Sequence, residues 1–76
     1  MSEEERRFLE EQLEWVKERD RLLCAIEYKL REMKLLAEYA KEVQHDREKV
    51  AEIQLEINRL LREINELQKQ CEQFLH

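Results

Sequence analysis

The second half of the chain carries an uninterrupted hydrophobic seam with heptad spacing. Its members follow one another at steps of 3, 4, 3, 4, 3, 4 and 3 residues, and they are Val50, Ile53, Ile57, Leu60, Ile64, Leu67, Cys71 and Phe74. β-Branched residues are prominent at one of the two alternating positions. This spacing predicts a helix that packs one narrow apolar side against another helix, as in a coiled coil.

The first half carries a seam of its own, which is out of phase with the second. It consists of Val16, Leu23, Ile26, Leu30, Met33, Ala37 and Ala40, and Arg19 interrupts its spacing. If the C-terminal register were extended backwards, its second core position would fall on Asp46, Glu32, Glu18 and Glu11. Buried carboxylates are costly, so the register must change within residues 41–49.

A reversal of the chain explains this change of register. Reflection of the sequence about position 45 pairs Ala40 with Val50 and Leu30 with Leu60, and it brings seven apolar layers into place. We therefore expect one all-α domain over residues 1–76, a two-helix antiparallel coiled-coil hairpin. Its helices are predicted over 3–43 and 47–75, with a turn over 44–46. The alternative is one long helix in a parallel coiled-coil dimer, which absorbs the change as a discontinuity in the supercoil.

The helix ends carry local signals of unequal strength. Ser2 followed by Glu5 fits a capping box at the start of the first helix. Asp46 is a suitable N-cap for the second helix. The chain contains no Gly and no Pro, so we expect Gln44 or His45 to take the left-handed conformation that Gly usually supplies at a helix end.

A second apolar stripe flanks the first-helix seam at steps of seven residues. Lys29 is its single interruption, and its members are Phe8, Trp15, Leu22, Leu36 and Val43. A face this wide is typical of a helix with two neighbours. We therefore expect the hairpins to pair into a homodimeric four-helix bundle with this stripe at the protein interface. Large aromatic side chains such as Trp15 and Phe8 are also typical anchors for another helical protein.

Charge and cysteine content narrow the function classes. The 14 basic and 19 acidic residues give a net charge of −5, which disfavours nucleic acid and anionic membranes as partners. The longest uncharged run is far too short to span a bilayer, and the acidic N-terminus resembles no signal peptide. Cys24 and Cys71 lie far apart without a CxxC motif. These features favour a cytoplasmic protein with free thiols.

No pattern of residues points to catalysis, a metal or a cofactor. A phosphate-binding loop requires glycine, and His45 and His76 have no further ligands at metal-binding spacing. Pairs such as Glu10 and Glu14 share a solvated helix face without a pocket that would shift a pKa. We expect a non-enzymatic, self-associating protein-binding or assembly module. The alternative is a chaperone-like or regulatory adaptor that sequesters an amphipathic helix of a partner protein.

Residues 31–64 carry a local resemblance. The segments are R-E-M-K-L-L-A-E-Y-A over 31–40, D-R at 46–47, I-Q-L-E-I over 53–57 and L-L-R-E-I over 60–64. They resemble the N-terminal coiled-coil region of flagellin, where one helix ends and an Asp-Arg pair begins the next. The resemblance implies a helix break before Asp46. It covers less than half of the chain, and we do not extend the filament-forming function of that family to this protein.

Overall fold

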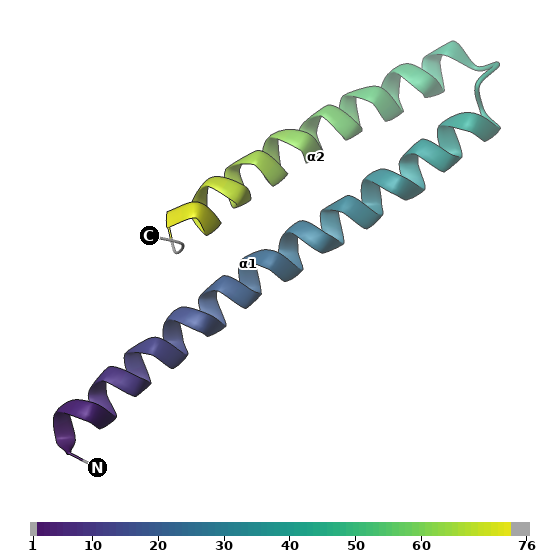
Figure 1. Ribbon diagram of the computed structural model, residues 1–76. Coiled ribbons are helices and arrows are strands. Elements are labelled where there is room, and N and C mark those ends of the chain that lie inside the picture. The colour runs from purple at the N-terminus through teal and green to yellow at the C-terminus, as the bar shows by residue number, and fades with distance from the viewer. Residues whose placement is uncertain (1, 74–76) are drawn as a thin grey trace.

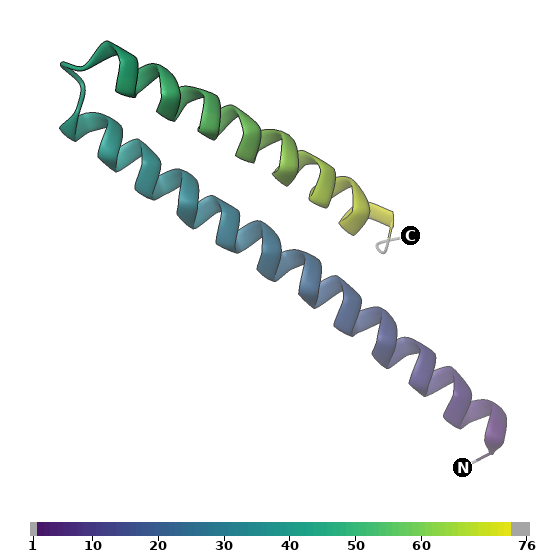
Figure 2. The same ribbon diagram turned by 180° about the vertical axis from the view of Figure 1, so that it is seen from behind.

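The protein is a two-helix hairpin. The computed structural model describes residues 2–73, and in it α1 spans Glu3–Glu42 and α2 spans Arg47–Gln73 (Figure 1). The two helices lie side by side and run in opposite directions in both views (Figure 2). The hairpin prediction is confirmed, and the described residues contain no strand. The single continuous helix is therefore not the fold of this chain.

The predicted helix bounds lie close to the observed ones. The first helix ends at Glu42 rather than at residue 43, and the second begins at residue 47 as expected. The expected end of the second helix at residue 75, and the predicted seam residue Phe74, lie outside the described residues.

The start of α1 follows the capping signal in the sequence. The backbone N–H of Glu5 donates to Ser2 Oγ at 3.1 Å, and the N–H of Arg6 donates to the Ser2 carbonyl at 3.0 Å. Glu3, Glu4 and Glu5 occupy the first turn, where the helix dipole favours negative charge. The first turn is therefore stabilised by both hydrogen bonds and charge.

The connection at residues 43–46 reverses the chain without a left-handed residue. The backbone N–H of Asp46 donates to the Val43 carbonyl at 2.8 Å, which closes a tight turn. No described residue has a positive φ, so the expectation of a left-handed Gln44 or His45 is wrong. The physical reason is that a turn closed between residues i and i+3 can be built wholly from negative φ angles.

Asp46 also begins α2. Its Oδ1 accepts a hydrogen bond from the Lys49 N–H at 3.1 Å, and its carbonyl accepts one from the Val50 N–H at 3.0 Å. One residue therefore closes the turn through its N–H and caps the next helix through its side chain. With these two roles of Asp46, the chain reverses direction without the glycine that is usual at a helix end and that the chain lacks.

The helices differ in length, and α1 extends past the end of α2. α1 has 40 residues and α2 has 27, which correspond to about 60 and 40 Å at 1.5 Å per residue. The Cα trace measures 66 × 17 × 12 Å along its principal axes. Lys29 pairs with Glu63 across the helices, so Gln73, ten residues later, lies level with about residue 19. The first four turns of α1 therefore extend beyond the described part of α2 (Figure 1).

We predict that Asp46→Ala lowers the free energy of unfolding by about 1 kcal/mol, because one backbone N–H of α2 loses its capping partner. Urea unfolding followed by circular dichroism at one fixed protein concentration measures this change. Asp46→Asn is the matched control, since an amide oxygen also caps a helix, and it should stay close to the unsubstituted protein. Equal losses in the two variants would contradict the capping role.

Candidate interaction surface

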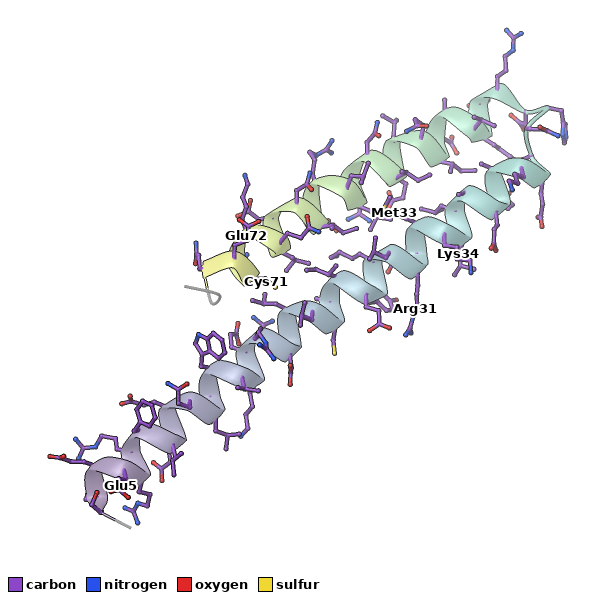
Figure 3. The ribbon with its side chains drawn as sticks, in the orientation of Figure 1. Glu5, Arg31, Met33, Lys34, Cys71 and Glu72 are labelled. Carbon is purple, nitrogen blue, oxygen red and sulfur yellow. The ribbon has the colours of Figure 1, made fainter. Side chains whose placement is uncertain are left out.

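A single line of side chains from each helix forms the interior of the hairpin. We call these two lines the seam. In α2 the seam is the predicted one, and Ile53, Leu60 and Ile64 are buried. In α1 the half-buried or buried positions at alternating steps of four and three are Trp15, Arg19, Leu22, Ile26, Lys29, Met33, Leu36, Ala40 and Val43. Met33 and Cys71 point into the space between the helices, whereas Arg31 points away from it (Figure 3).

The seam predicted for the first helix is therefore partly wrong. Ile26, Met33 and Ala40 do lie in it, but four of its predicted members lie one residue beyond the seam and are exposed: Val16, Leu23, Leu30 and Ala37. The prediction failed because two adjacent lines along α1 are both largely apolar. Lys29 interrupts one of these lines in the sequence, yet the observed seam accommodates it.

The residues predicted to form a protein interface occupy different environments. Leu22 is 1% exposed inside the hairpin, so it is not open to a second molecule. Leu36 and Val43, two and three heptads further along, are half-buried in the same line. Trp15 is half-buried one heptad before Leu22, and Phe8 is 58% exposed. Of this stripe, only Phe8 offers most of its side chain to solvent.

Two cationic residues, Arg19 and Lys29, lie in the α1 seam. Lys29 pairs with a carboxylate, and Arg19 lies over an aromatic ring. Lys29 Nζ lies 2.7 Å from Glu63 Oε2 in the other helix, and both side chains are about two-thirds shielded. A lysine packs its aliphatic stem against apolar neighbours while its ammonium group reaches a partner. The Arg19 guanidinium lies 5.5 Å from the centre of the Trp15 ring, and its Nε is buried without a hydrogen-bond partner among residues 2–73.

The Lys29–Glu63 pair connects α1 to a series of ion pairs on α2. Arg59 contacts Glu63 at 2.5 Å and also pairs with Glu56. The hydrogen bond from Lys29, followed by the charge of Arg59, holds the pKa of Glu63 below its usual value. The hydrogen bond from Arg59 likewise lowers the pKa of Glu56. Partial burial, and for Glu56 the charge of Glu63, oppose these shifts but are outweighed, so the pKa of each carboxyl group stays below its usual value.

The two sides of the hairpin differ in burial. Three residues from each helix, each directly preceding a seam residue, are half-buried on one side, and they are Glu18, Ala25 and Glu32 with Glu56, Glu63 and Gln70. Every described residue that directly follows a seam residue is exposed. A step of one residue rotates a side chain by about 100°. Because the helices run in opposite directions, this rotation carries both exposed lines to the same side of the hairpin.

We call this exposed side the open face. On α1 its large apolar members are Val16, Leu23 and Leu30, which are 36%, 48% and 51% exposed. On α2 it is uncharged over six successive positions at steps of 3, 4, 3, 4 and 3: Ala51, Gln54, Asn58, Leu61, Asn65 and Gln68. In a chain with 43% charged residues, this line marks the open face as the candidate interaction surface.

The extended N-terminal part of α1 presents further apolar side chains. Phe8 and Leu9, together with Glu4 and Glu5, line a shallow hollow that opens to solvent. Leu9 and Leu13 are 52% and 53% exposed. This segment has no described α2 residue beside it, so within residues 2–73 its apolar side chains have neighbours only in their own helix.

Reactive groups do not gather at any one place in the described structure. Cys24 and Cys71 are free, with Cys24 exposed and Cys71 half-buried in the seam. Residues 2–73 contain no group of three His, Cys, Asp or Glu side chains placed to hold a metal ion. Within the same residues, neither helix has an apolar stretch of the length needed to cross a bilayer.

Comparison with known proteins adds no relative. No family model matches the chain, and neither the curated proteins nor the solved structures contain a match. The resemblance of residues 31–64 to flagellin therefore stays a prediction from the sequence alone.

We predict that Leu22→Ala lowers the free energy of unfolding by about 2–5 kcal/mol, because it leaves a cavity in the seam. Leu35→Ala is the matched control, since Leu35 lies in the same helix and is 65% exposed. It should change stability by less than about 0.5 kcal/mol. Urea unfolding of both variants checks the pair, and equal effects would contradict the observed seam.

We also predict an effect of pH through Glu63. Its pKa is lowered in the folded chain by Lys29 and Arg59, so its contribution to stability is present above the ordinary carboxyl pKa near 4.5. That contribution is lost as the pH falls through the lowered folded-state pKa. Glu63→Gln should therefore flatten the fall in stability below about pH 5, as measured by thermal melts across the acid range.

The control for this measurement is Glu66→Gln. Glu66 lies three residues further along α2, is exposed, and makes no cross-helix ion pair in the described structure. If the fall in stability at acid pH flattens equally in both variants, the cross-helix pair does not set the pH dependence.

Proposed function

We propose that this chain is a small non-enzymatic helical protein that self-associates, as a homodimer with a four-helix core, and acts as a protein-binding or assembly module. The observation that carries this proposal is the imbalance between buried and exposed apolar side chains. Among residues 2–73 only Leu22, Ile53, Leu60 and Ile64 are buried. A larger set of Leu, Val, Phe and Tyr side chains stays exposed on the two helices.

Each helix of a hairpin has only one other helix beside it. A pair of this kind buries one line of side chains per helix, and chains of this size need further burial for a stable fold. The exposed leucines of the open face supply that burial when a second hairpin covers them. Self-association therefore removes apolar surface from water at the place where the single hairpin leaves it.

The compartment that fits this proposal is the cytoplasm. Cys24 and Cys71 are free thiols, and thiols persist in that form in a reducing environment. Their positions also argue against a bond within one chain. The Lys29–Glu63 pair places the residue level with Cys24 near position 68, so Cys71 lies about three residues, or 4.5 Å, further along the helix axis. Cys24 is exposed, whereas Cys71 faces the seam.

A second function is favoured by the extended N-terminal part of α1. Phe8, Leu9 and Leu13 are exposed there on a helix without a described neighbour, which suits a partner's amphipathic helix. In this alternative the chain is a chaperone-like or regulatory adaptor. It would be loosely helical alone and would gain helicity when such a helix is added.

Sedimentation equilibrium and thermal melts over a range of protein concentration test the first function. We expect a dimer at micromolar concentration, and a midpoint of melting that rises with concentration because only the folded chains associate. A monomer that is cooperatively folded at every concentration would remove the proposal. A poorly helical monomer whose helicity rises on addition of an amphipathic helical peptide would favour the adaptor.

A further inference from the structure

The open face of α1 has an ordered sequence of charges. Four charged residues alternate with the apolar ones along it, each directly following a seam residue. Asp20 and Glu27 precede Leu30, and Lys34 and Lys41 follow it. The charge therefore changes sign at Leu30, with the same seven-residue step on both sides. A second α1 laid on it in the opposite direction, with Leu30 at the centre, would meet opposite charges throughout.

From this pattern we infer that the partner of the open face is a second copy of this chain, related by a two-fold axis that passes at Leu30 and Leu61. The inference rests on the proposed self-association and specifies its surface and its symmetry. In this arrangement α1 packs against α1 of the other copy, and α2 packs against the other α2. Adjacent helices are antiparallel throughout the bundle.

The register on α1 follows from the residue numbers. With the axis at Leu30, each residue lies opposite the one whose number brings their sum to about 60 or 61. Glu27 then meets Lys34 of the other copy, and Asp20 meets the other Lys41, so the symmetry gives four ion pairs. Leu30 meets its own copy, and Leu23 lies opposite the small Ala37. Opposite charges facing each other in this way set orientation and register at an interface.

The same axis also brings chemically matching residues of the two α2 helices opposite each other, and this match supports the inference independently. The Lys29–Glu63 ion pair places Leu61 level with Leu30 to within about one residue, or 1.5 Å. A two-fold axis at that level brings Leu61, 43% exposed, onto the other Leu61. Gln54 then lies opposite Gln68, and Asn58 opposite Asn65. Amide side chains carry both donors and acceptors, so identical groups can pair with each other.

The dimensions of the open face suit a dimer. α2 provides 27 residues, or about 40 Å of helix, and the hairpin is 17 Å wide. Their product is about 700 Å² for each copy, close to the roughly 800 Å² per partner of a stable interface. The other two-fold arrangement stacks α1 on α2 of the second copy. There Glu27, Lys34 and Lys41 face uncharged residues. Asp20 lies level with the like-charged Glu72, and the pairing of opposite charges is lost.

Cysteine cross-linking tests the axis. The background is the variant Cys24→Ala, Cys71→Ala, provided that it sediments as the unsubstituted chain does. Leu30→Cys in this background should form an intermolecular disulfide rapidly on mild oxidation, because a two-fold axis brings identical residues of the two copies together. Leu35→Cys is the matched control, since Leu35 is 65% exposed but lies off the open face. It should not cross-link at a comparable rate.

The outcomes separate this inference from the proposed function. A dimer in which Leu30→Cys fails to cross-link, or in which Leu35→Cys does so equally fast, overturns the two-fold arrangement and leaves self-association in place. A disulfide between two chains that forms only in the variant with both Leu30→Cys and Leu61→Cys shows the other stacking and also overturns it. An unsubstituted chain that sediments as a monomer removes the proposed function itself.

Charge reversal tests the register with an internal rescue. Glu27→Lys should weaken the dimer about tenfold, because two attractive contacts become repulsive. Adding Lys34→Glu should restore the affinity, because position 27 of one copy is then basic and faces an acidic position 34 of the other. Glu10→Lys is the matched control, because Glu10 and Glu27 each pair with an arginine four residues away. Equal weakening in the control, or no rescue, overturns the register.

Discussion

The constraint on which the whole structure depends is that each helix has only one neighbour within the chain. Only one line of residues per helix can be shielded on both flanks, and every other line must face solvent or another molecule. The Lys29–Glu63 ion pair shows that a charged residue can also occupy a seam position. The Lys29 side chain in the seam reaches Glu63 of the other helix. This contact fixes which residues of α1 and α2 lie opposite each other.

The position of the chain reversal and the seam of α2 could be predicted from the sequence. The α2 seam is unbroken and has no competing apolar line beside it, and Asp46 gives a local signal for the start of the helix. The turn conformation could not be predicted, because a chain without glycine left a residue with positive φ as the usual solution. The observed solution uses the Asp46 N–H and side chain together, which no single-residue preference indicates.

The seam of α1 was missed for a different physical reason. Two parallel lines, one through Leu22 and Leu36 and the other through Leu23 and Leu30, have similar apolar content. Periodicity alone cannot separate them, and Lys29 interrupts the apolar spacing of the correct line. A signal did exist in the sequence. Reflection about the turn places Glu63 near Lys29, so an ion pair across the helices could have identified the seam that contains this lysine.

The unequal lengths of the two helices divide α1 into parts with different local dynamics. The part beside α2 is held by packing, so its amide hydrogens exchange with solvent only when the hairpin opens. The first four turns have no described α2 residue beside them, and an isolated helix of that length is marginal in water. Fraying therefore begins at the Ser2 cap and stops where the seam begins. We therefore expect the amide hydrogens of the N-terminal segment of α1 to exchange faster than those of the part beside α2.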